Sequence, residues 1–468
     1  MKYHSTISKK AYMKATGLDN AGSDLDEVIS SPIAEWKRPW WVRTVPEPTV
    51  EVDWDATERF DARKIQQVSF YKYVGEEENL RLRKLGAERS KQWIEENRPN
   101  YSLRDRAVDL AGRRGSVPTK FINEWAARPI AKASGGWGGQ MLSPEQLGVP
   151  RWEGSPEENS RMIRTVARNF GASQIGFVEL NERTRKLIYT YDARDGIKLD
   201  FEDVDKAYET GDRRVIPNKA QWVIVFSVQM SEELYKRLVG YAPTPLSSST
   251  TGIAYARGRN IIDRLQTFLY LIGYQGLMGT WENGLGMAPA LGIMAGLGEL
   301  SRLNKIVSPE YGPMQRVFKM VTDLPLAPTQ PIDAGIMRFC RTCKKCAEVC
   351  PSGTISMETD PFWEVKGPWN NPGHRTWFDD APKCLAYWIK STTSCATCLA
   401  VCPFAKKDKS FIHHVVEATV AKTTIFNSLF TKMDGLMGYD KPKDPASWWD
   451  LDLPMHGIDP TTGTSFDK

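Results

Sequence analysis

Residues Cys340–Pro351 read CRTCKKCAEVCP, and residues Cys395–Pro403 read CATCLAVCP. These two runs and Cys384 contain all eight cysteines of the 468-residue chain. Thiolates at such short spacings wrap one four-iron cube, while the cysteine before each proline reaches the neighbouring cube. Eight thiolates match the needs of two [4Fe-4S] clusters. The sequence therefore predicts a ferredoxin-like segment that transfers electrons.

Disulfides and structural zinc are the competing interpretations of these cysteines. Disulfide frameworks are typical of small secreted domains, whereas here one segment of a long chain holds every cysteine. Zinc ribbons use paired C-x2-C arms, which lack the third and fourth cysteines of these runs. The crossing rule assigns the first cluster to Cys340, Cys343, Cys346 and Cys402. The second cluster then receives Cys350, Cys395, Cys398 and, by elimination, Cys384.

The composition is that of an ordinary globular protein, with 41% hydrophobic and 25% charged residues. The formal net charge of +5 is small for this length, so no nucleic-acid partner is expected. No stretch approaches the roughly 20 unbroken apolar residues of a membrane helix. Residues 8–14 (SKKAYMK) resemble a twin-arginine export signal in which lysine replaces both arginines. The apolar segment that should follow is missing, so we expect this leader-like start to be degenerate.

Four units are expected: a covering unit at 1–150, an α/β domain at 151–330, the ferredoxin-like two-cluster domain at 331–410 and a helical tail at 411–468. Ser155 before Pro156 predicts the start of a helix that runs to residue 168. Further helices are predicted at 76–96, 116–132 and 256–273. Strands are predicted at 174–180, 186–191 and 222–228.

Two unusual stretches lie within the α/β domain. Residues 278–298 interleave glycine with methionine and alanine, which allows the backbone to approach a bulky ligand or a packed neighbour. Residues 247–251 (SSSTT) offer hydroxyl groups suited to a phosphate or polar tail. The alternatives are tight packing for the glycines and a serine-rich surface loop for the hydroxyl residues. The sequence alone does not decide between ligand contact and these alternatives for either stretch.

Beyond these patterns, the chain resembles the respiratory reductive dehalogenases, a family of corrinoid and iron–sulfur enzymes that remove halogens from organohalides. The likeness covers about residues 155–468, and the chloroethene-type members are most similar. It is carried by the cysteine runs, Thr322–Gly335, Gly296–Arg302 (GLGELSR), the helix from Ile253 onward and Phe426–Phe430. The resemblance implies an α/β (α+β) fold in which a nitroreductase-like corrinoid-binding core precedes the ferredoxin-like domain.

The resemblance also implies specific site residues and a cobamide whose lower base is detached. Tyr255 matches the family's proton donor, Arg316 its basic partner and Asn283 a polar residue that faces the substrate. Cofactor contacts are expected from Thr251, Ser249, Thr250, Gly284, Gly286 and Gly296. A D-x-H-x-x-G loop, which supplies a histidine to cobalt in other corrinoid proteins, is absent, and the chain has only five histidines.

The expected reaction is corrinoid-dependent removal of halogen from a small organohalide, a chlorinated ethene or alkane, with electrons that pass through both clusters. Epoxyqueuosine reductase is the first alternative, because it shares the corrinoid and two-cluster core. An iron–sulfur electron-transfer subunit is the second. By resemblance we expect a peripheral protein on the outer face of the cytoplasmic membrane, with a membrane anchor protein and an electron donor as partners. The degenerate leader keeps a cytoplasmic location open, and a homodimer also stays open.

Overall fold

The computed structural model describes residues 38, 41–102, 143–148, 150–279, 284–405 and 411–458. The leader-like residues 8–14, the helix predicted at 116–132 and Asn283 lie outside these ranges. Within them, no helix is both long and apolar enough to cross a membrane.

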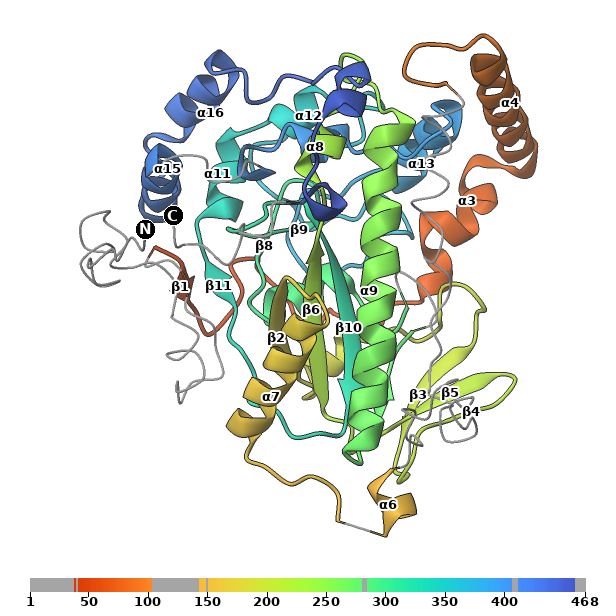
Figure 1. The fold of residues 1–468 in the computed structure, drawn as a ribbon, viewed down its shortest axis with the longest axis vertical. Coiled ribbons are helices and arrows are strands. Elements are labelled where there is room, and N and C mark those ends of the chain that lie inside the picture. The colour runs from red at the N-terminus through yellow and green to blue at the C-terminus, as the bar shows by residue number, and fades with distance from the viewer. Residues whose placement is uncertain are drawn as a thin grey trace, which may run out of the picture.

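An antiparallel sheet of four strands forms the centre of the molecule (Figure 1), in the order β2-β6-β10-β7. The strands are β2 (Gln174–Glu179), β6 (Trp222–Gln229), β10 (Gln315–Thr322) and β7 (Gly276–Leu277). The middle strand β6 is almost entirely buried because both faces of the sheet are covered. Its run of β-branched and aromatic side chains suits that position.

Alternate residues of β6 enter two different hydrophobic cores. Ile224, Phe226 and Val228 face α7 (Pro156–Asn169) and α9 (Pro245–Leu271), which lie across the front of the sheet (Figure 1). Val223 and Val225 face the opposite side, where α10 (Ala288–Met294) packs. Side chains of a strand point alternately to its two faces, so this single strand joins both cores.

Several predicted elements are confirmed. The helix that begins after Ser155 is α7, whose Ser155 side chain accepts a hydrogen bond from the Glu158 amide. The strands predicted at 174–180 and 222–228 are β2 and β6, and the helix predicted at 76–96 is α4 (Glu76–Glu95).

Two predicted elements differ from the structure. The helix expected at 256–273 begins earlier, at Pro245, because Thr244 and Ser247 form a capping box at its start. The strand predicted at 186–191 is wrong, and η3 (Thr184–Leu187) occupies its first part. The Asn181 side chain accepts hydrogen bonds from the Arg183 and Thr184 amides there, which favours a turn over an extended chain.

Segments far apart in sequence pack together around this centre. The N-terminal helices α3 (Gln66–Val74) and α4 pack on α13 (Ala381–Lys390), which carries Cys384. β1 (Arg43–Thr44) pairs with β11 (Ile332–Asp333) just before the cysteine segment. The N-terminal unit therefore lies against the predicted cluster domain.

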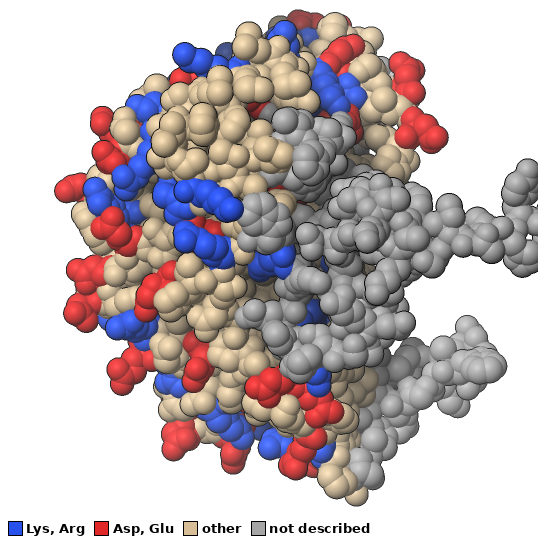
Figure 2. Space-filling model, turned by 90° about the vertical axis from the view of Figure 1, so that its left-hand side faces the viewer, with Lys and Arg blue, Asp and Glu red and all other residues tan. Residues whose placement is uncertain are grey.

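The remaining strands form two small sheets, and short helices complete the described fold. The strands are β3 (Lys198–Glu202), β5 (Arg213–Pro217) and β4 (Tyr208–Glu209) in one sheet, and β8 (Glu299–Leu300) and β9 (Ile306–Val307) in the other. The helices are η1 (Ala62–Lys64), α6 (Pro144–Leu147), α8 (Glu232–Tyr235), α11 (Ile336–Thr342), α12 (Lys345–Glu348), α14 (Thr397–Ala400), η4 (Pro403–Ala405), α15 (Phe411–Lys422), α16 (Asn427–Leu436), η5 (Ala446–Asp450) and η6 (Met455–Gly457). Acidic and basic side chains alternate over much of the face shown in Figure 2.

The contact between α9 and β10 provides a test of this packing. A Cβ atom at Gly258 would lie 2.0 Å from the Phe318 ring, so Gly258→Ala must displace that ring. We expect a loss of about 1–3 kcal/mol in the free energy of unfolding, measured by urea denaturation. Gly211→Ala is the matched control, because a Cβ atom at Gly211 would have no neighbouring atom within 4 Å. Equal stability of the two variants would contradict this packing.

Candidate functional site

Four of the cysteines line one small hollow between helices. Cys340, Cys343, Cys346 and Cys402 surround about 360 Å³ together with Phe339 and Phe404, among others. Cys340 lies in α11 and Cys343 directly follows it. Cys346 lies in α12, and Cys402 follows α14. None of the eight cysteines is in a disulfide. The structure thus brings together the set that the crossing rule assigned to the first cluster.

Arg302 holds this cysteine segment in place. Its buried guanidinium donates hydrogen bonds to the carbonyl of Cys340 at 2.7 and 3.0 Å, and to those of Ser356 at 2.7 Å and Glu358 at 2.6 Å. It also lies over the Trp377 ring. A planar donor with several fixed N–H groups suits this role better than a lysine would. The last residue of the GLGELSR motif therefore anchors the backbone of the first cysteine run.

The other four cysteines lie within electrostatic reach of one another. Burial raises the pKa of Cys384 to about 12, and the neighbouring Cys395 and Cys350 contribute to the increase. Burial likewise raises the pKa of Cys398, with further contributions from Cys395, Cys384 and Cys350. Burial opposes ionisation of Cys350 as well, but hydrogen bonds from Ser352 and Thr354 lower its pKa to about 7. These residues are the set expected for the second cluster.

The hydroxyl groups at 247–251 serve the fold of α9. Ser249 Oγ donates to the Leu246 carbonyl at 2.8 Å, and Thr250 Oγ1 accepts from the Ser231 amide at 2.9 Å. Both residues are buried, so the surface loop does not describe them, and their contact with a cofactor stays a prediction. Ser248 lies 2.6 Å from Ser394, next to Cys395. The start of α9 is therefore tied to the loop of the second cysteine run.

Tyr255 and Arg316 meet between α9 and β10. The Arg316 guanidinium lies 5.5 Å from the centre of the Tyr255 ring. Arg316 donates to Thr251 Oγ1 at 3.2 Å and to the Tyr235 hydroxyl at 3.4 Å, and these two oxygens are 2.8 Å apart. The Tyr255 ring also contacts Phe318 edge-on. Three residues singled out in the sequence are thus neighbours, and Tyr235 is a fourth that no sequence signal indicated.

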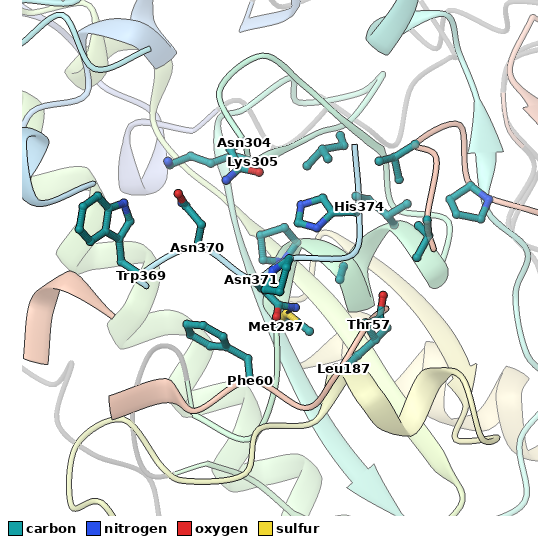
Figure 3. A pocket seen from close by; sticks show the side chains of 18 of the residues that line it. Thr57, Phe60, Leu187, Met287, Asn304, Lys305, Trp369, Asn370, Asn371 and His374 are labelled. Atoms are coloured by element: carbon teal, nitrogen blue, oxygen red, sulfur yellow. Dashed lines mark hydrogen bonds between the residues drawn. The ribbon is translucent and has the colours of Figure 1, made fainter. Parts of the chain in front are cut away.

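A large cavity lies where three distant segments converge. It encloses about 1190 Å³, part of it open to solvent, and is walled by residues of 48–66, 287–305 and 369–381 together with Leu187 and Tyr189. Figure 3 shows the amides of Asn370 and Asn371 beside Lys305, His374 and the apolar Phe60, Leu187 and Met287. Its lining combines apolar side chains with a few polar groups, as the lining of ligand sites commonly does. The cavity is therefore the candidate site for a bound cofactor.

Lys305 connects the cavity with both groups of functional residues. Burial would lower its pKa, but Asp379, Cys398 and Cys384 raise it above the ordinary value, with Arg316 acting in the opposite direction. Lys305 and Asp379 both line the cavity. Lys305 is therefore within electrostatic range of Cys384, Cys398 and Arg316.

The predicted glycine contacts have a different role. A Cβ at Gly286 would lie 2.7 Å from the Leu187 carbonyl, and one at Gly296 would lie 2.2 Å from the Gln330 carbonyl. Gly296 also has a positive φ of 72°. Both glycines are tightly packed and neither lines the cavity, and their contact with a cofactor stays a prediction. Gly284 packs against Gly279. A Cβ atom built at Gly279 would lie 2.2 Å from the backbone of Gly284.

Comparisons with known proteins identify the family. Residues 37–326 match the reductive dehalogenase subunit family, and residues 339–405 match the 4Fe-4S double cluster binding domain. The chain belongs to the reductive dehalogenase family. It is 30% identical to chloroethene reductive dehalogenase of Dehalococcoides mccartyi strain VS, over 98% of this chain and 100% of that protein. It is 32% identical to tetrachloroethene reductive dehalogenase of Sulfurospirillum multivorans, over 76% of this chain and 72% of that protein.

The fold also matches that of a solved reductive dehalogenase. The catabolic enzyme NpRdhA superimposes with a TM-score of 0.58 and 20% identity, over 86% of this chain. This chain spans 49% of that protein's length. Another solved structure of a reductive dehalogenase, described in terms of B12-dependent dehalogenation, superimposes with a TM-score of 0.57 and 20% identity, over 86% of this chain and 49% of that one.

This reductive dehalogenase also has a cavity residue that no sequence motif indicated. His374 lines the cavity, and its ring contacts Phe378 edge-on at 5.1 Å. Burial lowers the pKa of His374 to about 4. No local sequence pattern marks it, because its position depends on residues 48–66 and 287–305 folding against the same loop.

The lowered pKa of His374 predicts a pH dependence of stability. The unfolded chain takes up a proton at this histidine below about pH 6.5, whereas the folded chain does so only near pH 4. Between pH 7 and pH 5 this difference removes about 2 kcal/mol from the free energy of unfolding. His374→Gln should lose that much less over the same range in urea titrations. The less buried His456 is the control: if His456→Gln has the same effect, the assignment is wrong.

Proposed function

We propose that this reductive dehalogenase removes halogen from small chlorinated hydrocarbons, with a base-off cobamide in the large cavity and two [4Fe-4S] clusters on the eight cysteines. The observation that carries the proposal is the large cavity, whose lining residue Lys305 is within electrostatic range of Cys384, Cys398 and Arg316. When bound, the corrinoid supplies a reducible cobalt centre for cleavage of the carbon–halogen bond. The overall reaction consumes the organohalide, two electrons and one proton, and yields the hydrocarbon and halide.

The cavity walls fit a corrin. Apolar side chains such as Phe60, Leu187 and Met287 can cover the macrocycle, and the amides of Asn304, Asn370 and Asn371 can bond the amide groups at its rim. We further propose that the sheet with α7, α9 and α10 is a nitroreductase-like core that carries this cavity. The lining residues come from three segments that are distant in sequence, so the cavity exists only in the folded chain.

We assign the ligand sets as the crossing rule predicts. Cys340, Cys343, Cys346 and Cys402 bind the first cluster, and Cys350, Cys384, Cys395 and Cys398 bind the second. The hollow that the first set lines supports this division. Cys384 and Cys398 of the second set are within electrostatic range of Lys305 in the cavity wall, so a cluster on this set would supply the electrons to the cavity.

Tyr255 is the proposed proton donor. A phenol has an ordinary pKa of about 10, so it keeps its proton at neutral pH and gives it up only when the phenolate is stabilised. The Arg316 guanidinium lies over the Tyr255 ring and supplies that positive charge. Thr251 and Tyr235 accept hydrogen bonds from Arg316 and thereby fix its orientation. Asn283 stays a prediction as a residue that faces the substrate.

The curated relatives act on chloroethene and tetrachloroethene according to their names, and we propose the same substrate class here. A panel of chlorinated ethenes and alkanes, assayed with reduced viologen on cofactor-loaded protein, tests this choice. Halide release from any of them supports it, whereas turnover of epoxyqueuosine-containing tRNA alone would favour the first alternative. A membrane anchor protein, a homodimer and a location on the outer face of the membrane remain predictions from the family resemblance.

Tyr255→Phe removes the donated proton and leaves the ring in place. We expect cobalt and iron contents to stay at wild-type values while halide release falls by about a hundredfold or more, the range of general acid catalysis. Tyr235→Phe should cause a smaller loss, because it removes only one acceptor of Arg316. Tyr274→Phe is the matched control, since its hydroxyl bonds the Trp152 carbonyl at the far end of α9. Full activity of Tyr255→Phe would refute the donor assignment.

Cys384→Ala tests the ligand assignment that rests on elimination. The variant should lose the [4Fe-4S] signal of the second cluster in electron paramagnetic resonance and keep that of the first. Cys402→Ala should show the opposite pattern, because Cys402 lines the hollow of the first set. Two intact clusters in Cys384→Ala would mean that another residue completes the second site.

A further inference from the structure

The C-terminal helix α16 presents an unusual concentration of exposed apolar side chains. Leu429 is 52% exposed, Met433 36% and Leu436 86%, and they recur at the spacing of one helical face. The flanking residues extend this apolar face, with Ile425 82%, Phe426 46% and Met437 59% exposed. Contiguous apolar surfaces of this kind are typical of contact sites, whereas single exposed apolar residues are not.

Within residues 421–441, all of which the structure describes, the exposed charged side chains are lysines. Lys422, Lys432 and Lys441 are exposed on α16 and on both sides of it. The one acidic residue of α16, Asp434, is buried and forms an ion pair with Lys345. Asp440 also pairs with Lys345, at 2.9 Å. Figure 2 shows a broad uncharged area in the upper part of this side of the molecule, with basic side chains near its rim.

The inner face of α16 packs beside the first cysteine set. Phe430 packs against the small core that contains Phe339 and Cys343. Helix α16 also contacts α11, which carries Cys340. One side of this helix therefore lies against the cysteine segment, while the opposite side is apolar and rimmed by lysines.

We propose that α16 lies in the surface of an anionic lipid membrane, with Leu429, Met433 and Leu436 inserted between the lipids. An amphipathic helix with lysines beside its apolar face is suited to this position, because apolar burial and attraction to anionic headgroups act together. The lysine rim favours an anionic surface over a neutral one. A second copy of the chain would bring these lysines together and so fits less well.

The orientation follows from the inner face of the helix. With α16 in the lipid surface, the first cysteine set lies close to the membrane, because α16 packs against the segment that carries it. This consequence rests on the proposed function, because it assumes that the cysteines hold clusters. The lipid contact itself does not depend on that function.

Vesicle sedimentation of the full chain tests the lipid contact. We compare phosphatidylcholine vesicles with and without phosphatidylglycerol. Wild-type protein should sediment with the mixed vesicles, and Leu429→Gln/Met433→Gln/Leu436→Gln should bind them at least about tenfold more weakly. Glutamine is a good helix former, so α16 should persist. Lys422→Gln/Lys432→Gln/Lys441→Gln should lose the preference for the anionic lipid.

Leu80→Gln/Met357→Gln/Met455→Gln is the matched control, because these apolar residues are also exposed but lie outside α16. It should bind like the wild type, and all variants should keep the visible absorption of the clusters. Equal binding of the α16 variant and the wild type would overturn the proposal, as would a wild type that ignores the mixed vesicles. A dimer that the α16 variant alone disrupts, measured by sedimentation equilibrium without lipid, would instead assign this face to a second copy. If the wild type binds the vesicles but releases no halide, only the proposed function is contradicted.

Discussion

A single buried guanidinium fixes the cysteine segment to the rest of the molecule. Arg302 follows the short strand β8. It donates hydrogen bonds to the carbonyl of Cys340, where the first cysteine run begins, and to that of Ser356, beyond the end of the run. A charged group can be buried at this depth only when several acceptors surround it, and these carbonyls meet that need. The consequence is that the loops around the thiols have a defined position relative to the sheet.

Helix α9 connects the residues around Tyr255 with the second cysteine run. Helix α9 carries Tyr255 and Thr251 along one side, and its start is tied to the loop of the second cysteine run through Ser248 and Ser394. Strand β10 presents Arg316 to that helix, with Phe318 packed beneath Tyr255. One helix therefore sets the distance between the proposed proton donor and the second cysteine run, which suits a reaction that requires a proton and electrons at the same atom.

The cavity depends on segments that are remote in sequence. Residues 48–66 reach across the molecule to residues 369–381, and the bridge between Val52 and His374 joins them. Helices α3 and α4 close the same side by packing on α13. The N-terminal unit, whose sequence is irregular, thus forms part of the wall of the large cavity. The burial that it causes keeps His374 neutral over most of the pH range.

Sequence by itself determined the chemistry of the thiols, because cluster spacing is a local property of a few consecutive residues. It also singled out Tyr255, Thr251 and Arg316, through resemblance to a family. The tertiary structure decided what local patterns could not. It packs Thr250, Gly286 and Gly296 against residues distant in sequence. Tyr235, Lys305 and His374 gain their roles only when separate segments converge, since proximity in space has no local signature in the chain.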